Sequence, residues 1–345
     1  MTQIRRTGFA LPVMAQIAVA LAAAMAMRTA MATADWSAGA EARIEQFRRP
    51  GLFVHDPSTI VTCKSEYWFF STGPGIASRR SKDLGKWEAG PRVFSAPPAW
   101  TKSVVADFRG YFWAPDVICL KDRFLLYYSV SKWGKNTSAI GLAVNPTLDP
   151  ADPNCHWTDC GSVIQSSAGD NFNAIDPCVT QDVSGRLWLA FGSFWSGIKL
   201  IELDPATGKR IAPDSPIRSL AHHDMIEAAY VYRHGAYYYL FVNWGLCSRG
   251  VNSTYNIRVG RSPDITGPYL DKSGVDMLRD GGSLFLGTRG SMIGPGHAGI
   301  LSENGKDWLS CHFYDGKENG RPTLAILPLQ WAADGWPEVA ADLGE

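Results

Sequence analysis

The sequence has no excess of either charge. Its 345 residues include 33 Lys and Arg and 33 Asp and Glu, so the formal net charge at pH 7 is +0. It has no arginine-rich run or basic stripe, which argues against nucleic acid as a partner. Beyond the N-terminal segment it has no apolar run long enough to span a bilayer. We therefore expect no nucleic-acid ligand and no membrane association of the mature chain.

Two other common signatures are missing. No G-x-S-x-G motif is present, so the sequence does not predict a serine hydrolase of the α/β type. The seven cysteines lack the spacing of a zinc site, and because their number is odd they cannot all pair within the chain. Cys155 and Cys160 lie in a turn-like stretch and are candidates for one disulfide, but the sequence leaves the pairing open.

The N-terminal segment has the three parts of an export signal. Two arginines precede an apolar run over residues 9–27, and small residues at positions 30 and 32 match a signal-peptidase cleavage pattern. A transmembrane anchor is the alternative, but it is less favoured because the run is mostly alanine. We predict that residues 1–32 are a cleaved signal peptide. Residues 33–345 are then a single domain that is secreted or periplasmic.

A repeat of aromatic-rich hairpins runs through the rest of the chain. Five times, a turn that carries an acid or a histidine leads into an apolar strand, a polar break and a second strand rich in Trp, Tyr or Phe. The residues at the turns are Asp56, Asp116, Asp176, Glu227 and His297, at intervals of roughly 50 to 70 residues. This repeat predicts an all-β fold, a five-bladed β-propeller with four-stranded antiparallel blades around a central channel.

Such a propeller would gather the turn residues at one mouth of its channel. Glycoside hydrolysis usually needs two carboxyl groups, one ionised and one protonated. Asp56 and Asp176 each precede proline, which favours an extended backbone. Glu227 lies among apolar neighbours, which favour a raised pKa. Each motif alone is more typical of a turn or a buried strand residue, but five in register favour an active site.

Short motifs follow one another in order over the mature chain. They are VHDPS (54–58), FWAPD (112–116), NTSAIG (136–141), NAIDP (173–177), FGSFWSGI (191–198), IEA (226–228), CSRGVNSTY (247–255), GPGH (294–297) and DGWP (334–337). With these motifs the chain resembles the family-43 glycoside hydrolases, specifically the secreted endo-1,5-α-L-arabinanases. The resemblance implies a five-bladed propeller that hydrolyses with inversion of the anomeric centre. It also implies that Asp56 is the general base and Glu227 the general acid, while Asp176 orients the acid and raises its pKa.

The same resemblance implies sugar-binding residues and a channel metal. The residues expected at the sugar subsites are Phe112, Trp113, Gly134, Asn173, Ser193, Phe194 and Trp195. For Phe194 and Trp195, a place in the blade core is a nearly equal alternative. His297 matches a histidine that binds a channel ion, generally calcium, together with water molecules. Calcium prefers oxygen ligands, so the resemblance alone supports this site.

Three functions remain open at this point. The favoured one is an exported hydrolase that binds arabinan and arabino-oligosaccharides and cuts internal α-1,5 bonds. The second keeps the same acid and base but acts from the chain end, on arabinofuranosides or β-xylosides. The third is a propeller that binds carbohydrate without cleaving it. Asp56, Asp176 and Glu227 argue against the third, because binding alone needs no separate acid and base. The sequence does not predict the oligomeric state.

Overall fold

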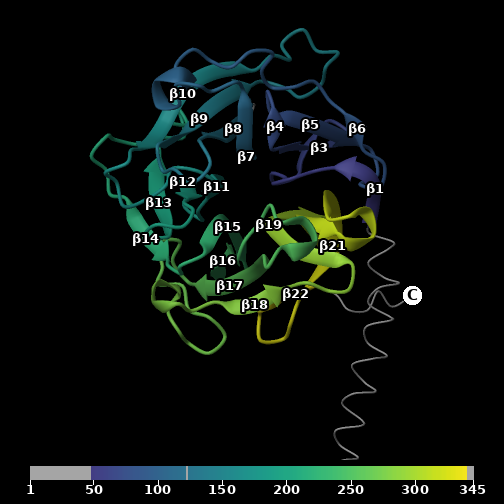
Figure 1. Ribbon diagram of the computed structural model, residues 1–345, viewed down its shortest axis with the longest axis vertical. Helices are drawn as coiled ribbons and strands as arrows, with labels where there is room; N and C mark the ends of the chain where they lie inside the picture. The colour runs from purple at the N-terminus through teal and green to yellow at the C-terminus, as the bar shows by residue number, and fades with distance from the viewer. Residues whose placement is uncertain (1–47, 122, 340–345) are drawn as a thin grey trace, which may run out of the picture. The chain divides into compact units, whose positions relative to one another are not determined.

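The fold is nearly all-β over the residues that the computed structural model describes, 48–121 and 123–339. Five antiparallel sheets form a ring around a common axis (Figure 1). The helical elements among these residues are single turns: α2 (Thr101–Val104), η1 (Gly250–Asn252), η2 (Met277–Arg279) and η3 (Gly316–Glu318). The predicted five-bladed β-propeller is therefore confirmed. The predicted signal peptide, residues 1–32, lies outside the described residues.

Each blade is built from strands that follow one another in the chain. Blade 1 contains β2 (Val61–Cys63), β3 (Glu66–Ser71), β5 (Ala77–Ser81) and β6 (Glu88–Ala89). Blade 2 contains β7 (Tyr111–Leu120), β8 (Arg123–Val130), β9 (Ser138–Asn145) and β10 (Thr158–Ser166), with the short β4 (Gly73–Pro74) paired to β7. Blade 3 contains β11 (Cys178–Gln181), β12 (Leu187–Phe191), β13 (Ile198–Leu203) and β14 (Arg218–Ala221). Blade 4 contains β15 (Ile226–His234), β16 (Tyr237–Trp244), β17 (Asn256–Ser262) and β18 (Ser283–Leu286).

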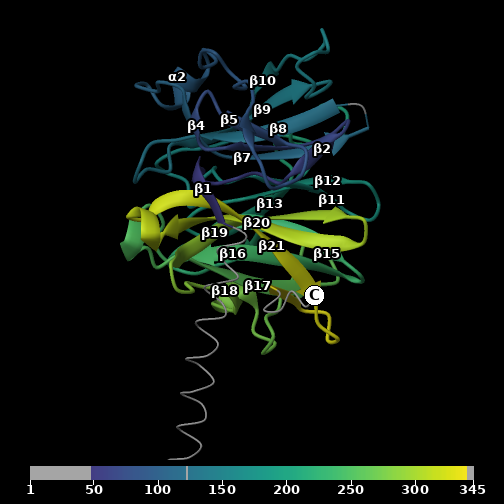
Figure 2. The same ribbon diagram turned by 90° about the vertical axis from the view of Figure 1, so that its right-hand side faces the viewer.

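Blade 5 closes the ring by combining strands from both ends of the described chain. It contains β19 (Met292–Glu303), β20 (Lys306–Asp315), β21 (Arg321–Trp331) and β22 (Pro337–Val339). The first strand, β1 (Arg48–Phe53), pairs antiparallel with β21, and the two lie side by side in Figure 1 and Figure 2. The backbone N–H of Val54 continues the contact by donating to the carbonyl of Pro322 at 3.2 Å. Residues 54–56 are therefore held against blade 5.

Apolar side chains fill the space between neighbouring blades. Trp68, Phe70, Phe112 and Tyr128 belong to the core between blades 1 and 2. Leucines and isoleucines dominate the next core, between blades 2 and 3. Burial of one such large side chain contributes about 1.5–3 kcal/mol. Most of the aromatic content of the chain therefore stabilises the packing of blade on blade.

A left-handed residue lies shortly before or within the inner strand of every blade. The five residues and their φ values are Asp56 (50°), Ala114 (37°), Asp176 (57°), Ala228 (54°) and His297 (62°). Positive φ is uncommon outside glycine. In blades 2, 4 and 5 the strand register also shifts beside this residue, as in a β-bulge. The kink re-aims the side chains at the start of the strand.

The left-handed kink shows that two sequence-based predictions are wrong: the extended backbone at Asp56 and Asp176, and the alignment of the repeat in blades 2 and 4. The backbone at Asp56 and Asp176 is left-handed and not extended, because it turns there into the inner strand. In blade 2 the residue at the kink is Ala114, so Asp116 lies two residues further along β7. In blade 4 the kink falls on Ala228, one residue after Glu227. The five-fold repeat is present, but its alignment in blades 2 and 4 differs from the predicted one.

Asp116 ties three blades together and does not line the active-site cavity. Its buried carboxylate accepts the backbone N–H of Thr59 at 3.0 Å and that of Val179 at 2.9 Å. Thr59 precedes the strands of blade 1 and Val179 lies in blade 3, so a side chain of blade 2 bridges its two neighbours. Burial raises the pKa of Asp116 to about 6, although the backbone donors oppose this shift.

We predict that Asp116→Asn destabilises the protein by about 1–3 kcal/mol at pH 4, because the amide nitrogen cannot accept a backbone N–H. The raised pKa means that the folded protein holds this proton more tightly than the unfolded chain. Wild-type stability from this group is therefore fully present below about pH 4 and falls as the pH rises through about 6. Asparagine has no such dependence, so the penalty should shrink by pH 7.

Urea unfolding of both proteins at pH 4 and pH 7 measures this difference. Asp214→Asn, at an exposed turn, is the matched control and should leave stability unchanged at both values. A penalty for Asp116→Asn that is the same at pH 4 and pH 7 would contradict the raised pKa.

Candidate active site

One cavity of about 890 Å³ is lined by residues from all five blades. Every sequence-predicted site residue except Phe112 lines it, namely Asp56, Trp113, Gly134, Asn173, Asp176, Ser193, Phe194, Trp195, Glu227 and His297. These residues are distant in sequence and come from turns and strand starts of different blades. The ring of blades therefore gathers them in one place, as the repeat predicts.

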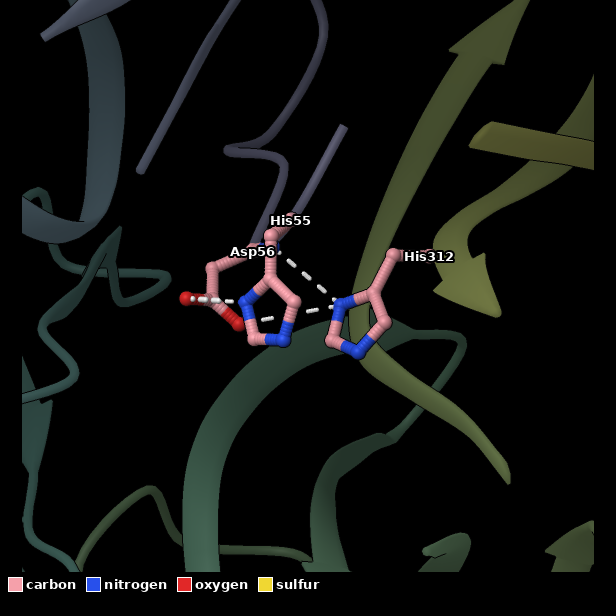
Figure 3. Close-up of side chains that lie close together, drawn as sticks. All are labelled: His55, Asp56 and His312. Carbon is pink, nitrogen blue, oxygen red and sulfur yellow. Dashed lines mark hydrogen bonds and ion pairs between the residues drawn. The ribbon is translucent and has the colours of Figure 1, made fainter. Parts of the chain in front are cut away.

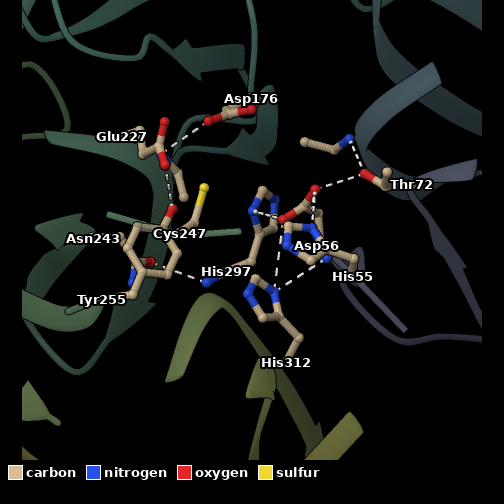
Figure 4. A network of polar contacts seen from close by, with 12 residues as sticks. His55, Asp56, Thr72, Asp176, Glu227, Asn243, Cys247, Tyr255, His297 and His312 are labelled. Atoms are coloured by element: carbon tan, nitrogen blue, oxygen red, sulfur yellow. Dashed lines mark hydrogen bonds and ion pairs between the residues drawn. The ribbon is translucent and has the colours of Figure 1, made fainter. Parts of the chain in front are cut away.

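Asp56 is surrounded by donors that favour its charged form. Its Oδ2 atom lies 2.8 Å from Nδ1 of His55 and accepts the hydroxyl of Thr72 at 2.6 Å (Figure 4). Its Oδ1 atom lies 3.5 Å from Nδ1 of His297 and 3.6 Å from Nδ1 of His312. Burial opposes ionisation, but the charge and hydrogen bond of His55, together with the charges of His297 and His312, outweigh it. The pKa of Asp56 is therefore held well below its ordinary value.

Glu227 lies on β15, and its surroundings favour the protonated form, in contrast to those of Asp56. Its Oε2 atom accepts the hydroxyl of Ser193 at 2.7 Å, and its Oε1 atom accepts the hydroxyl of Tyr255 at 2.9 Å. Burial raises the pKa of Glu227, and the negative charge of Asp56 raises it further. The hydrogen bonds from Ser193, Tyr255 and the thiol of Cys247 oppose this shift without cancelling it. Glu227 is therefore suited to hold a proton.

Asp176 supports the backbone beside Glu227. Its own N–H donates to the hydroxyl of Ser129 at 3.0 Å, and its Oδ2 atom accepts the N–H of Ala228 at 3.2 Å. Ala228 directly follows Glu227, so Asp176 holds the kink that aims the glutamate. Burial and the charge of Glu227 both raise the pKa of Asp176. The orienting role of Asp176 stays a prediction.

Exposed aromatic rings border the cavity. Trp195 is 42% exposed and Phe194 is partly exposed, both at positive φ in the turn after β12, so the core interpretation of these two residues is wrong. Across the cavity, Trp113 packs edge-on against Trp133, with ring centroids 6.3 Å apart. Trp133 is 69% exposed, and Gly134 follows it in the loop with φ 69°. Flat apolar rings of this kind complement the C–H faces of sugars.

Phe112 is not part of the cavity wall. It is 0% exposed and packs against Phe94, Phe108 and Tyr128 in the core between blades 1 and 2. Successive side chains of a strand point to opposite faces. Because Trp113 faces the cavity, its neighbour Phe112 faces the core, and the prediction that both approach the substrate is wrong for Phe112.

Two buried polar side chains differ in how free they are to bind a ligand. The hydroxyl of Ser193 is occupied by Glu227, so it serves the glutamate before it serves a substrate. The Oδ1 atom of Asn173 is buried and has no hydrogen-bond partner among the described residues. An unsatisfied buried acceptor costs about 1–3 kcal/mol. Asn173 is therefore the more available acceptor of the two.

The residues around His297 supply few of the oxygen ligands that calcium prefers. Its backbone N–H donates to Asn243 at 3.0 Å, and the nearest carboxylate oxygen is that of Asp56. Calcium takes six to eight oxygen ligands, whereas His55 and His312 bring further nitrogens to this place. Bound calcium would have to take most of its ligands from water.

Among the described residues, His55, Asp56 and His312 bring three potential metal-ligand atoms within 4.8 Å of one another (Figure 3). The hydrogen bonds of this group leave little for a cation. Nδ1 of His312 accepts the backbone N–H of Asp56 at 3.2 Å, and the proton on Nδ1 of His55 faces Oδ2 of Asp56. A nitrogen whose lone pair is occupied, or that carries a proton, does not bind a metal. The group is better described as the hydrogen-bonded surroundings of Asp56.

Several residues of the site have no role in the sequence-based prediction. They are His55, Thr72, Cys247, Tyr255, His312 and Tyr314. His55 is adjacent to Asp56, and this adjacency is the one signal that could identify it. Tyr314 and Thr72 reach the site only through the packing of the blades.

Cys155 and Cys160 are both free thiols in the structure. Cys155 accepts a long contact from the side chain of Asn145 at 3.9 Å, while the thiol of Cys160 donates to the carbonyl of Thr158 at 3.7 Å. The two side chains have different surroundings, and the suggested disulfide between them is not found.

A β-propeller whose cavity holds one carboxylate with a lowered pKa and one carboxyl with a raised pKa has the equipment of a glycoside hydrolase. Residues 50–337 match the sequence model of glycosyl hydrolases family 43. The chain belongs to this family.

Relatives within the family have names that refer to arabinan. The extracellular exo-α-(1→5)-L-arabinofuranosidase of Cellvibrio japonicus is 45% identical, over 83% of this chain and 86% of the relative. The extracellular endo-α-(1→5)-L-arabinanase 1 of Bacillus subtilis is 41% identical, over 82% of this chain and 87% of the relative. The solved structure of Cellvibrio cellulosa α-L-arabinanase complexed with arabinohexaose has a TM-score of 0.80 and 44% identity, over 84% of this chain and 96% of that one.

We predict that Tyr255→Phe moves the basic limb of the pH–rate profile to higher pH. The hydrogen bond from Tyr255 favours the carboxylate form of Glu227 and so lowers its pKa against the effect of burial. Removal of this bond raises the pKa of Glu227, and an acid with a higher pKa keeps its proton to higher pH.

The measurement is kcat/KM against pH for wild type and variant. Tyr67→Phe is the matched control, because Tyr67 donates to Glu303 at 2.5 Å outside the cavity. It should leave the profile unchanged. If the basic limb of Tyr255→Phe stays in place or moves to lower pH, Tyr255 does not lower the pKa of the group that must hold the proton.

Proposed function

We propose that the protein hydrolyses α-1,5-L-arabinofuranosidic bonds of arabinan by an inverting mechanism, with Asp56 as general base and Glu227 as general acid. The observation that carries this proposal is the opposite electrostatics of two carboxyl groups in one cavity. Donors around Asp56 lower its pKa, whereas burial raises the pKa of Glu227. One group is therefore ready to accept a proton and the other to give one.

In the proposed reaction, Asp56 takes a proton from a water molecule that attacks the anomeric carbon. Glu227 gives its proton to the departing glycosidic oxygen on the other side of the sugar. The C–O bond of the glycoside breaks as the bond to water forms, so the configuration inverts. Inverting enzymes hold the two carboxyl groups about 6.5–9.5 Å apart to leave room for that water. Asp176 keeps the backbone of the acid in place through Ala228.

Arabinan as the substrate is supported by the names of the relatives and by the sugar-binding character of the cavity wall. We favour internal cutting, because the cavity is lined by all five blades and carries exposed rings at Tyr111, Trp133 and Trp195. A long wall of rings suits several sugar units at once. Action from the chain end is the second candidate, supported by the relative that is named an exo-arabinofuranosidase.

Export to the periplasm or the exterior is part of the proposal. The two curated relatives reported above are named extracellular, and residues 1–32 have the pattern of a signal peptide. Among the described residues no helix has the length and apolarity needed to cross a membrane. Calcium at His297 stays a prediction from the resemblance, and no step above depends on it.

We predict that Glu227→Gln lowers kcat on linear arabinan by about 10²–10⁴-fold and leaves KM little changed, because the shape is kept and only the proton donor is lost. Steady-state kinetics with the purified mature protein measure both constants. Glu202→Gln, on β13 outside the cavity, is the matched control and should behave as wild type. Near-normal turnover by Glu227→Gln would remove Glu227 from the role of acid.

We expect early products of linear arabinan to be a mixture of short oligosaccharides, with a rapid fall in mean chain length, because internal bonds are cut. Chromatography of the products over time measures this, with xylan and an aryl arabinofuranoside as comparison substrates. Release of one small product from intact long chains would support the second candidate instead. Cleavage of xylan alone would overturn arabinan as the substrate.

A further inference from the structure

We propose that Tyr314 and Thr72 are positioning residues that reserve one oxygen of Asp56, Oδ1, for the proton of the attacking water. The inference rests on the proposed role of Asp56 as general base. It follows from two chains of hydrogen bonds that start at backbone N–H groups of other blades and end on the same carboxylate oxygen, Oδ2.

The first chain runs from the loop after β16 through blade 5. The backbone N–H of Ser248 donates to the hydroxyl of Tyr314 at 2.5 Å, and this hydroxyl lies 2.9 Å from Nε2 of His55. Burial opposes a charge on His55, but the charge of Asp56 and the hydrogen bond to it raise the pKa of His55, so the ring carries both protons at low pH. When the ring is neutral, the Tyr314 hydroxyl donates to Nε2, which places the single ring proton on Nδ1. Nδ1 lies 2.8 Å from Oδ2 of Asp56. Tyr314 therefore selects the tautomer that can donate to the base.

The second chain comes from blade 2. The backbone N–H of Ala114, the kink residue of that blade, donates to the hydroxyl oxygen of Thr72 at 2.8 Å. Thr72 in turn donates to Oδ2 of Asp56 at 2.6 Å. Because its oxygen already accepts an N–H, the hydroxyl proton of Thr72 is directed at the carboxylate.

The two chains leave the oxygens of Asp56 unequal. Oδ2 has two short hydrogen bonds. Among the described residues, the polar contacts of Oδ1 are the longer ones to Nδ1 of His297 and of His312, at 3.5 and 3.6 Å. His312 does not donate to Oδ1 from Nδ1, because that nitrogen accepts the backbone N–H of Asp56 at 3.2 Å. Oδ1 therefore keeps its lone pairs for a proton that arrives from the cavity.

The loop that begins the first chain also contacts the acid. Ser248 has φ 55°, and Cys247 directly before it lines the cavity and bonds through its thiol to Glu227. One dipeptide thus contacts Glu227 on one side and, through Tyr314, the partner of Asp56 on the other. The Cys247-Ser248 backbone therefore links the position of Glu227 to that of Asp56.

The competing explanation is that Tyr314 is a packed core residue whose hydroxyl needs a partner. Tyr314 is 2% exposed and contacts the ring of His55 with centroids 5.9 Å apart, so packing alone accounts for its burial. The two explanations differ in the effect of Tyr314→Phe on kcat when His55 is replaced by a residue that has no tautomers.

The test is a double-mutant cycle between Tyr314→Phe and His55→Asn, with kcat and KM measured on linear arabinan. An asparagine amide can donate to Oδ2 from the place of Nδ1 but has no tautomers and does not reach Tyr314. We expect Tyr314→Phe to lower kcat about 10- to 100-fold in the wild-type background, as for the loss of a hydrogen bond that supports a charged group, with KM little changed. In the His55→Asn background the same substitution should have almost no further effect.

Two further comparisons complete the experiment. Thr72→Ser keeps the hydroxyl and should retain most of kcat, whereas Thr72→Val should lose about ten-fold or more. Tyr237→Phe removes a tyrosine hydroxyl on blade 4 outside the cavity and should match wild type. Thermal unfolding of every variant separates loss of fold from loss of function.

An equal loss of kcat from Tyr314→Phe in both backgrounds would show a packing role and overturn the inference, as would unchanged kcat in the single variant. Failure of the proposed function looks different. In that case wild type would not cleave arabinan, or Asp56→Asn would retain full activity, whatever the result of the cycle.

Discussion

Three carboxyl groups, Asp56, Asp176 and Glu227, line one cavity, and most of the site can be understood from the repulsion among them. A buried charge is costly unless it is paired or hydrogen-bonded, and neighbouring like charges cannot all ionise. The structure resolves the conflict by distributing donors unevenly. Asp56 has His55 and Thr72 as close partners, and its pKa is low. Burial raises the pKa of both Asp176 and Glu227. The difference in pKa between Asp56 and Glu227 is thus set by their surroundings and not by the residue type.

Several residues around Asp56 come from other blades. His312 and Tyr314 belong to β20, and Thr72 follows β3. Ala114, which donates to Thr72, lies in the inner strand of blade 2. Deeper in the ring, Asp116 performs a related task by bridging backbone N–H groups of its two neighbouring blades. In both places a polar side chain accepts a backbone N–H of another blade: Thr72 accepts that of Ala114, and Asp116 accepts those of Thr59 and Val179. Without these side chains the N–H groups would lack a partner. The packing of blade on blade therefore sets the chemistry of the site.

The sequence predicts the ring and its main carboxyl groups because both depend on local patterns that repeat. Asp56, Asp176 and Glu227 stand beside recognisable turns, and the hairpins after them have alternating apolar residues. The errors at Asp116 and Phe112 have one physical cause: the kink with its bulge shifts the strand start by one or two residues, and alternation then decides between core and cavity. Contacts such as that of His55 with Tyr314 join positions separated by 259 residues. No periodicity in a single sequence encodes such a pair.

The pairing of β1 with β21 has a consequence for when this protein can work. Asp56 lies three residues after the end of β1, and β1 is held by a strand near the other end of the chain. The partners of Asp56 on β20 are also made late in synthesis. A nascent chain therefore contains Asp56 with His55 and Thr72 but lacks His312, which accepts the backbone N–H of Asp56. The complete surroundings of Asp56 therefore form only after β20 and β21 have been made, so the order of synthesis delays assembly of the cavity until the ring can close.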